Sequence, residues 1–325
     1  MSKSRVLIFG AGGMLGRDVV DVFSVSHEVF ATDLKNVNGS IQLCDGANLA
    51  QVKKVCKSFR PDMVINLAAQ TSLEFCESNP SIAWRDNVLS CEVTLSEARK
   101  LGIPYVFIST AGIFDGLLRE YTEYSTPNPL SIYGKSKMFS ESLVSTYDNG
   151  FVVRAGWMMG GGIKDHKFVS LIVRQIILDS SKVIHAVDDK YGTPTYTRDF
   201  ARGLVQIIDS APPGLYHQVC HGSASRYEVA QEIARYFGPE IKVNSVNSEF
   251  FEKTYFASRP KSEQLINFKL QNLGLDVMNH WKISLQEYLP GLVEEICIRN
   301  GVKVFEPPAG IEPTTFALRG RRSTD

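Results

Sequence analysis

Residues 5–16 read Arg5-Val6-Leu7-Ile8-Phe9 and then Gly10-Ala11-Gly12-Gly13-Met14-Leu15-Gly16. The first five residues form a short apolar run, which is typical of a buried parallel strand, and a helical pattern begins inside the glycine run. Gly10 allows a tight turn, Gly13 lets the backbone approach a pyrophosphate, and Gly16 lets a helix pack closely on the strand. The stretch therefore predicts the first strand, loop and helix of a dinucleotide-binding fold.

A second predicted strand, residues 27–32, ends in Asp33, 17 residues after Gly16. A carboxylate at this place can accept hydrogen bonds from both hydroxyls of an adenosine ribose and repels a 2′-phosphate. NADH is therefore the favoured cofactor, and NADPH stays open. The simpler alternative for Asp33 is a surface carboxylate at a strand end.

Strands and helices alternate through the first half of the chain, which predicts an α/β, Rossmann-type doubly wound parallel sheet. Helix patterns are followed by short apolar strands, and the strand that begins at Asp62 runs into Ala68-Ala69-Gln70-Thr71. The carboxyl ends of these strands face the ligand crevice of such a sheet. The predicted elements are helices at 48–59 and 81–100 and strands at 62–69, 105–109 and 151–154.

Tyr133 and Lys137, in the run Ser-Ile-Tyr-Gly-Lys-Ser-Lys, are four residues apart and share one face of a predicted helix. A cation about 4 Å from a phenol favours the phenolate by about 4 kcal/mol at an effective dielectric of roughly 20. The pair is thus expected to lower the phenol pKa from about 10 toward about 7 and to make Tyr133 a proton donor. A solvated lysine on an exposed helix is the alternative.

The whole composition excludes several classes of function. Lys plus Arg equals Asp plus Glu, at 35 each, so no net charge recruits nucleic acid or an anionic membrane. No apolar run reaches the about 18 residues of a membrane span. Six cysteines show neither Cys-x-x-Cys pairs nor zinc spacing, so no metal is expected. We expect reduced thiols in a cytoplasmic protein.

The chain divides into two lobes and a tail. We expect residues 1–158 to form the NAD(P)-binding Rossmann domain, with a return contribution near 190–208, and residues 159–304 to form a substrate-binding α/β lobe. The glycines at 160–162 predict a flexible loop between them, and Tyr216-His217 is placed in the second lobe. From 305 to 325 the apolar periodicity stops, which predicts a disordered tail.

Eight motifs in this order resemble the extended short-chain dehydrogenase/reductases, and most closely the dTDP-4-dehydrorhamnose reductases. The resemblance spans about residues 4 to 290. It is carried by the glycine loop 10–16 and by the segments 61–66, Asn87, 108–110 with 114–116, 133–137, 192–196, 214–217 and 257–260. It implies a nicotinamide cofactor on the N-terminal lobe and a nucleotide-sugar between the lobes, and it leaves a homodimer open.

The resemblance also implies roles for individual residues. Tyr133 resembles the proton donor, Lys137 the residue that holds the nicotinamide ribose, and Thr110 the hydroxyl that orients the substrate carbonyl. Substrate-binding positions are Thr71, Asn87, Trp157 and Arg259. Cofactor-binding positions are Gly10, Gly13, Met14, Leu15, Gly16, Asp33, Asp45, Ala68, Ala69, Tyr133 and Lys137.

Three of these positions have structural alternatives. Trp157 is either a sugar-stacking aromatic or plain core, Asn87 is either a ligand or a satisfied helix amide, and Arg259 either grips a diphosphate or closes a surface ion pair.

One departure from the family pattern concerns the two residues after Thr110. Typical members carry an acidic and an aromatic residue there, whereas this chain has Ala111 and Gly112. A sugar dehydratase needs a carboxylate pair at these places, because eliminating water requires an acid and a base beyond the tyrosine. Dehydratase is therefore disfavoured. Loss of the aromatic predicts a wider sugar pocket and leaves the identity of the sugar undecided.

The leading hypothesis is a reductase of a nucleotide-linked 4-keto-6-deoxy sugar that takes hydride from NAD(P)H. A nucleotide-sugar epimerase, which regenerates its bound NAD in each cycle, is the second hypothesis. The third is a non-catalytic regulatory subunit resembling that of methionine adenosyltransferase.

Overall fold

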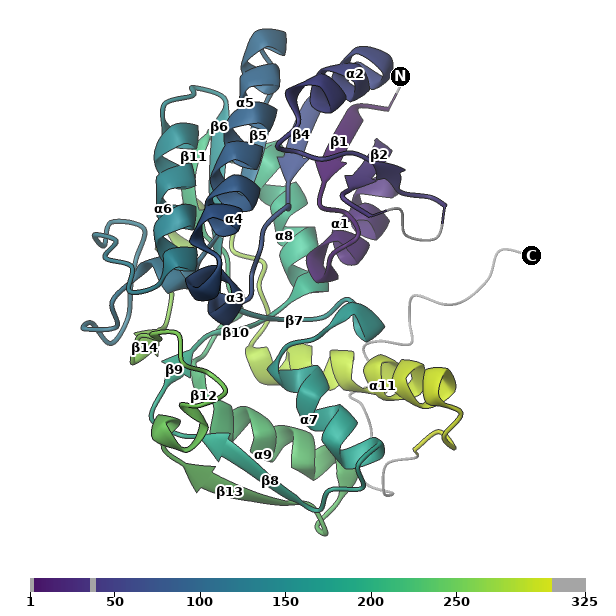
Figure 1. Ribbon diagram of the computed structural model, residues 1–325, viewed down its shortest axis with the longest axis vertical. Helices are drawn as coiled ribbons and strands as arrows, with labels where there is room; N and C mark the ends of the chain where they lie inside the picture. The colour runs from purple at the N-terminus through teal and green to yellow at the C-terminus, as the bar shows by residue number, and fades with distance from the viewer. Residues whose placement is uncertain (1–2, 36–38, 306–325) are drawn as a thin grey trace.

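A computed structural model describes residues 3–35 and 39–305 of the chain, and its centre is a seven-stranded sheet (Figure 1). All paired neighbours in this sheet run parallel, in the order β11-β6-β5-β4-β1-β2-β3. This confirms the predicted doubly wound α/β fold. The strands are β1 (Arg5–Phe9), β2 (Glu28–Asp33), β3 (Gln42–Leu43), β4 (Met63–Asn66), β5 (Tyr105–Thr110), β6 (Gly150–Ala155) and β11 (Gly214–His217).

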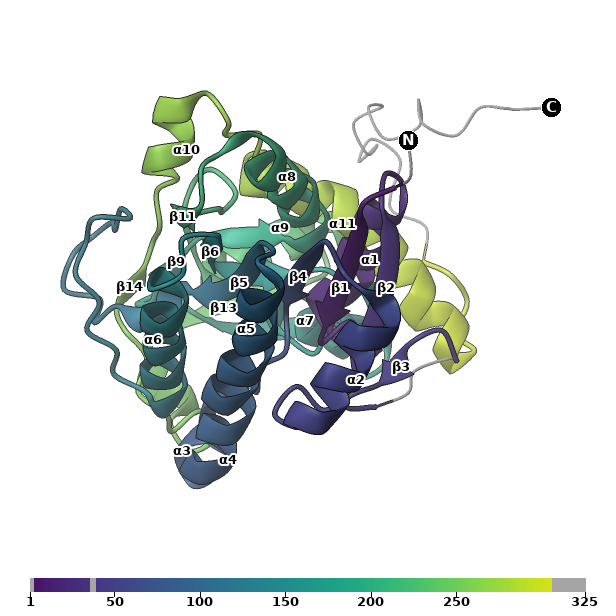
Figure 2. The same cartoon turned by 90° about the horizontal axis from the view of Figure 1, so that it is seen from above.

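Helices cover both faces of the sheet (Figure 2). Val6 and Ile8 of β1 point into one apolar core, and Leu7 and Phe9 point into the other, because successive strand residues alternate between faces. Two-sided coverage explains why β1 is apolar throughout its buried part. The first core includes residues of α1 (Met14–Ser24) and α8 (Thr197–Ser210), and the second includes residues of α2 (Leu49–Phe59), α5 (Ser90–Leu101) and α6 (Ile132–Ser145).

The predicted helix at 81–100 is a composite of three segments. It begins as α4 (Pro80–Trp84), continues as the π-helical segment η1 (Arg85–Leu89) and ends as α5, whose C-cap Gly102 has φ 67°. A π segment inserts an extra residue into a helix and is frequent at functional sites. The short helix α3 (Leu73–Ser78) precedes it.

The second lobe has its own apolar core, built from the helices and strands below the main sheet in Figure 1. Its helices are α7 (Phe168–Ile177), α9 (Arg226–Phe237) and α11 (Trp281–Asn300), and the short helix α10 (Phe268–Leu273) joins the first lobe through Leu270. Its strands are β7 (Trp157–Met159), β8 (Val183–Val187), β9 (Tyr191–Gly192), β10 (Pro194–Tyr196), β12 (Ala224–Ser225), β13 (Lys242–Val246) and β14 (Ser262–Glu263). Short 3₁₀ turns are η2 (Ala111–Ile113), η3 (Gly162–Lys164) and η4 (Ser248–Phe251).

The chain returns to the first lobe over a longer stretch than 190–208. Helix α8 supplies Phe200 and Leu204 to the core that α1 shares with the sheet. Strand β11 then pairs with β6, with Gly214 opposite Phe151. The return therefore reaches residue 217, and the expectation that Tyr216 and His217 belong to the second lobe is corrected.

The glycines at 160–162 form a tightly packed contact, which corrects the expectation of a flexible loop. Gly161 has φ +69°, and a Cβ atom there would collide with the backbone of Met14 in the first turn of α1. Glu295 of α11 joins this contact by accepting a hydrogen bond from Ile163 N at 2.8 Å and by pairing with Arg17 at 2.7 Å. The second lobe is thus fastened to the start of α1.

Two expectations concern the membrane and the tail. No helix in the described part of the chain combines the length and the apolar character that crossing a bilayer requires. Phe305, the first residue of the predicted tail, packs against Phe237 with ring centroids 4.8 Å apart. The rest of that tail, residues 306–325, lies outside the described residues.

His217 is fully buried on β11 and held in one neutral tautomer. Its Nε2 accepts a hydrogen bond from Arg154 at 3.2 Å, since a guanidinium can only donate, and Nδ1 donates to the Ile266 carbonyl at 3.1 Å. Burial and the charge of Arg154 lower the pKa of His217 to about 3. The ring therefore stays neutral in the folded protein.

This geometry predicts acid sensitivity. Above pH 6.5, the approximate pKa of His217 in the unfolded chain, the ring is neutral in both the folded and the unfolded state. Below that pH the unfolded chain binds a proton that the folded protein does not. The free energy of unfolding therefore falls as the pH drops toward about 3, the pKa of His217 in the folded protein. The expected contribution is about 1.4 kcal/mol of unfolding free energy per pH unit. Urea unfolding of native protein and His217→Gln between pH 7 and pH 4.5 checks it. The variant should show the shallower pH dependence, and equal slopes would contradict the assignment.

Candidate active site

The glycine loop lies at the carboxyl end of β1, where the sheet opens toward the second lobe. Gly10 has φ +77°, and a Cβ atom there would lie 2.5 Å from Ala68 N, so only glycine allows the loop to pack against the end of β4. Gly13 is exposed and is the N-cap of α1, which begins at Met14. No side chain caps this end of the helix by a hydrogen bond. The first N–H groups of this helix, including those of Leu15 and Gly16, thus form an anion-binding terminus free of a covering side chain.

Asp33 lies beside this loop, as predicted. Its Oδ2 accepts a hydrogen bond from Gly12 N at 2.9 Å, and its Oδ1 accepts one from Lys35 N at 3.1 Å. The loop and the carboxylate are therefore a single connected unit. The arrangement fits a dinucleotide whose phosphates approach the start of α1 and whose adenosine ribose approaches Asp33.

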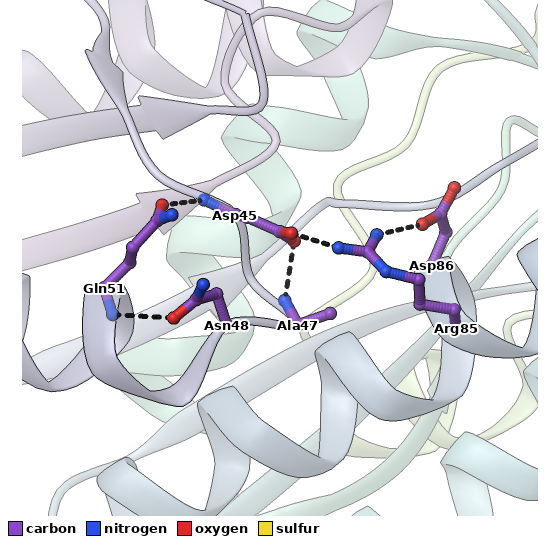
Figure 3. Close-up of polar contacts among 6 residues, drawn as sticks. All are labelled: Asp45, Ala47, Asn48, Gln51, Arg85 and Asp86. Carbon is purple, nitrogen blue, oxygen red and sulfur yellow. Dashed lines mark hydrogen bonds and ion pairs between the residues drawn. The ribbon is translucent and has the colours of Figure 1, made fainter.

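Asp45 has protein partners that the sequence did not indicate (Figure 3). Its Oδ1 accepts a hydrogen bond from Ala47 N at 2.9 Å, and its Oδ2 pairs with Arg85 of the π-helical segment. Arg85 also pairs with Asp86 at 2.8 Å. Both oxygens of Asp45 thus hold the loop before α2 against η1, and a direct cofactor contact by this residue stays a prediction.

The residues Thr110, Tyr133 and Lys137 come together at the ends of β5 and α6. Ser131 caps α6 by accepting a hydrogen bond from Gly134 N at 3.1 Å, which fixes the helix start just before Tyr133. The Thr110 hydroxyl is near enough to the Tyr133 phenol to lower its pKa. Lys137 is 3% exposed, and its Nζ lies 3.9 Å from the centroid of the Phe107 ring.

The expected lowering of the Tyr133 pKa by Lys137 is absent from this structure. Burial raises the pKa of Tyr133 to about 12, and the hydrogen bond from Thr110 opposes this rise only in part. Burial also lowers the pKa of Lys137 to about 8. Desolvation is the largest cause of both shifts, and the Lys137 charge is not among the causes that act on Tyr133. The phenol keeps its proton at neutral pH, which is the state a proton donor needs.

Lys137 provides a test of whether a cofactor fits. No hydrogen bond or ion pair to its Nζ occurs within residues 3–35 and 39–305, although the group is buried beside Tyr133. Its ammonium therefore has donors free for a ligand, and ribose hydroxyls are suitable acceptors. The residues present therefore fit a nicotinamide ribose at this point.

Asn87 is a structural amide rather than a free ligand, which corrects its assignment to substrate binding. Its side-chain oxygen accepts from Gln70 N at 2.7 Å, and its nitrogen donates to the Gln70 carbonyl at 3.2 Å and to Ser136 Oγ at 2.9 Å. At 1% exposure it has no surface left for a ligand. It ties the loop after β4 to the helix that carries Tyr133.

Trp157 is half-buried at the start of β7, and its ring is enclosed by polar and charged neighbours. Its Nε1 donates a hydrogen bond to Glu263 Oε2 at 2.7 Å. The Arg226 guanidinium stacks 3.7 Å from its ring centroid, and a Cβ atom at Gly192 would collide with the ring. Arg226 therefore lies over one face of the Trp157 ring, and stacking of this ring on a sugar stays a prediction.

Thr71 and Arg259 both connect the two lobes. Arg259 pairs with Glu74 of α3 at 2.7 Å and donates to the Ala257 carbonyl at 2.9 Å. Thr71 Oγ1 accepts a hydrogen bond from Lys167 Nζ at 3.1 Å. The ion-pair alternative for Arg259 is thus present in this structure, and contact of either residue with a substrate stays a prediction.

Glu263 and Arg226 also lie at this site, although no sequence motif marks either residue. Glu263 follows the Arg-Pro motif by three residues, and only the pairing of β14 with β9 brings it toward the cleft. A Cβ atom at Gly112 would lie 3.4 Å from Glu263 Oε1, so this carboxylate borders the space left by the absent aromatic residue. A wider sugar pocket at this place stays a prediction. Arg226 begins α9 and showed no pattern of its own.

Comparison with known proteins gives relatives along almost the whole chain. The spore coat polysaccharide biosynthesis protein SpsK of Bacillus subtilis is 32% identical, over 88% of this chain and 97% of that protein. A dTDP-4-dehydrorhamnose reductase of Streptomyces griseus is 30% identical, over 94% of this chain and 98% of its own length. Methionine adenosyltransferase 2 subunit beta of Xenopus tropicalis is 28% identical, over 90% of this chain and 89% of its own.

Among solved structures, the dTDP-4-dehydrorhamnose reductase of Bacillus anthracis in complex with NADP superposes with a TM-score of 0.80. It is 29% identical, and the match covers 88% of this chain and 98% of that one. The family model of the RmlD substrate binding domain matches residues 4–293, a span that contains the glycine loop, the residues around Tyr133 and most of the second lobe's core. The chain belongs to the RmlD substrate binding domain family.

Proposed function

We propose that the protein is a nucleotide-sugar reductase that converts the 4-keto group of a nucleotide-linked 4-keto-6-deoxy sugar to an alcohol with NAD(P)H. The observation that carries this proposal is that Thr110 acts on Tyr133, with Lys137 one turn further along the same helix, in a sheet whose first strand ends in a glycine loop of dinucleotide-binding geometry. Relatives named as dTDP-4-dehydrorhamnose reductases support the class of substrate.

The cofactor would be held by residues from two parts of the sheet edge. The loop around Gly13 and the start of α1 would bind the diphosphate, Asp33 the adenosine ribose, and Lys137 the nicotinamide ribose. Ala68 and Ala69, at the end of β4, would border the same groove. When bound, the nicotinamide supplies hydride to the substrate carbonyl carbon.

The chain's own residues would supply the proton and stabilise charge. Tyr133 keeps its phenolic proton at neutral pH and would donate it to the carbonyl oxygen as negative charge develops there. The Thr110 hydroxyl, which acts on the Tyr133 phenol, would orient the same oxygen. The Lys137 ammonium, held in a water-poor place, would stabilise the tyrosinate left behind.

The decisive experiment follows NADH loss at 340 nm with a panel of nucleotide-linked 4-keto-6-deoxy sugars. Net, substrate-dependent oxidation of NADH supports the reductase. An epimerase would change the sugar without net loss of NADH, and a regulatory subunit would bind cofactor without changing any sugar. The regulatory-subunit outcome is relevant because methionine adenosyltransferase 2 subunit beta is among the relatives.

We expect the native protein to prefer NADH to NADPH. The carboxylate of Asp33, fixed against Gly12 at 2.9 Å, would repel a 2′-phosphate. Asp33→Asn should reduce the ratio of kcat/KM for NADH over NADPH by about 10-fold, the effect of one lost repulsion of about 1.4 kcal/mol. Initial rates with each cofactor measure this ratio.

The matched control is Asp62→Asn, because Asp62 also accepts a backbone hydrogen bond, from Arg5 N, but at the opposite end of β1. This variant should keep the native ratio. A native protein that prefers NADPH would contradict the prediction. Arg17 would not then be the 2′-phosphate ligand unless it left Glu295, with which it pairs at 2.7 Å.

We place the protein in the cytoplasm. All six cysteines are buried and none forms a disulfide. Burial raises the pKa of the Cys91 and Cys220 thiols to about 11, so they stay protonated and unreactive. Unpaired thiols of this kind support a reducing compartment.

A further inference from the structure

Glu263 is a carboxylate that the second lobe delivers to the catalytic pair. It ends β14, which pairs with β9 in the second lobe, and its Oε2 accepts the hydrogen bond from Trp157 Nε1 at 2.7 Å. Its negative charge is close enough to Tyr133 to contribute to the raised pKa of that phenol. Glu263 therefore belongs to the same site as Tyr133, although 130 residues separate them in the chain.

Gly112 is the place where this carboxylate approaches the first lobe. A Cβ atom at position 112 would lie 3.4 Å from Glu263 Oε1 and 3.5 Å from Thr110 Oγ1. The free carboxylate oxygen and the catalytic hydroxyl thus border the same small volume above Gly112. A substrate whose carbonyl is held by Thr110 would bring the neighbouring sugar carbons toward Oε1.

The oxygen Oε1 has no hydrogen-bond donor among the described residues, whereas Oε2 is engaged by Trp157. Burial raises the pKa of Glu263, and the hydrogen bond from Trp157 and the charges of Arg226 and Arg259 oppose that rise. Oε1 is therefore available to accept a hydrogen bond from a hydroxyl of a bound ligand.

The surroundings decide which ligand group suits Oε1. A phosphate would be repelled by the carboxylate. An ammonium group would be repelled by Arg226, Arg259 and Lys190, whose positive charges all act on Glu263. A neutral hydroxyl donates a hydrogen bond without either penalty, and the sugar ring carries hydroxyls next to its carbonyl.

We propose that Glu263 is a specificity-determining residue, which accepts a hydrogen bond from a hydroxyl of the sugar through Oε1 while Trp157 holds Oε2. The proposal rests on the proposed function for the identity of the ligand as a nucleotide-sugar. A site built to bind a hydroxyl rejects an analogue that lacks it, because the buried acceptor is then left unpaired. Native protein should therefore favour the hydroxylated sugar over the matching 2-deoxy or 3-deoxy analogue by about 100-fold in kcat/KM.

The test compares native protein, Glu263→Ala and Glu263→Gln with a dTDP-linked 4-keto-6-deoxy sugar and its 2-deoxy and 3-deoxy analogues. Glu263→Ala should lose efficiency with the hydroxylated sugar but change by less than about 3-fold with the analogue that lacks the recognised hydroxyl. Glu263→Gln keeps an acceptor and should retain part of the preference. Melting curves of the variants, matched to the native curve, establish that they fold.

Trp157→Phe separates recognition from positioning. This change removes the indole N–H but leaves the carboxylate, so the preference for the hydroxylated sugar should survive even where overall efficiency falls. If Glu263→Ala instead lowers efficiency equally for all sugars, Glu263 only positions Trp157 and the proposal is overturned. An unchanged preference in Glu263→Ala overturns it as well.

Binding of the 4-hydroxy sugar nucleotides, measured by calorimetry on protein loaded with the oxidised cofactor, distinguishes this proposal from the proposed function. If the Kd values differ between the hydroxylated sugar nucleotide and its deoxy analogue, and this difference disappears in Glu263→Ala, the role of Glu263 is supported even when no sugar is reduced. If the sugar nucleotide and its deoxy analogues bind equally tightly and NADH-dependent turnover occurs, the proposed reductase function is supported and the role of Glu263 is overturned. Failure to bind any nucleotide-sugar overturns both.

Discussion

Tyr133→Phe should lower kcat by about 100-fold or more while the protein still binds NADH. The substitution keeps the ring and its packing but removes the phenolic hydroxyl and its proton, on which the Thr110 hydroxyl acts. The transition state then develops charge on the carbonyl oxygen with no adjacent acid. Steady-state rates with the best 4-keto sugar, alongside NADH affinity from fluorescence titration, measure the two effects separately.

Tyr124→Phe is the matched control, because Tyr124 is 74% exposed and its ring only contacts Phe268 edge-on. This variant should retain native turnover. If Tyr133→Phe turns over at a similar rate, then Tyr133 is not the proton donor. A loss of NADH affinity equal to the loss of turnover would instead assign Tyr133 a role in cofactor binding.

The sequence was most informative where function depends on local spacing. The glycine loop and Asp33 follow one another within a single strand-loop-helix-strand unit, so their proximity could be predicted from order alone. Tyr133 and Lys137 share a helix face at any i, i+4 spacing. Even the N-cap of α2 at Asn48 and the stop of α5 at Gly102 follow from residue type.

Features that depend on burial or on distant segments could not be predicted in this way. The pKa of Tyr133 depends on how much water the second lobe excludes, and desolvation reverses the direction that the Lys137 charge alone implies. Asn87 loses its predicted role because Gln70 and Ser136, from two other segments, use all its polar atoms.

Long-range pairing also explains the misplaced strand. Strand β11 has only four residues, and its partner β6 lies about 60 residues earlier, so no local pattern assigns it to the main sheet. Glu263 was missed for the same reason, since only the strand pairing of β14 turns it toward Gly112. The same pairing explains why His217 is neutral, because β11 buries its ring against the guanidinium of Arg154.

Glu141→Ala should destabilise the protein by about 3–5 kcal/mol, the usual cost of leaving one member of a buried ion pair without its partner. Glu141 on α6 accepts hydrogen bonds from Arg154 of β6 at 3.0 Å and 2.7 Å, and the two side chains are 8% and 3% exposed. After the truncation, the hydrogen bond to His217 is the remaining polar side-chain contact of the Arg154 guanidinium among the described residues. Helix α6 also carries Tyr133 and Lys137. The variant should therefore lose affinity for the cofactor as the temperature approaches its lowered melting temperature.

Urea unfolding at 25 °C measures the loss, and the exposed pair of Arg5 and Glu28 provides the matched control. Those charges lie 3.3 Å apart with 33% and 55% of their side chains exposed, so Glu28→Ala should cost no more than about 1 kcal/mol. Glu141→Gln should fall between the two alanine variants, because the amide oxygen still accepts one hydrogen bond from Arg154 but carries no charge. Equal losses in Glu141→Ala and Glu28→Ala would mean that water reaches Arg154 and that the ion pair does not hold α6 against the sheet.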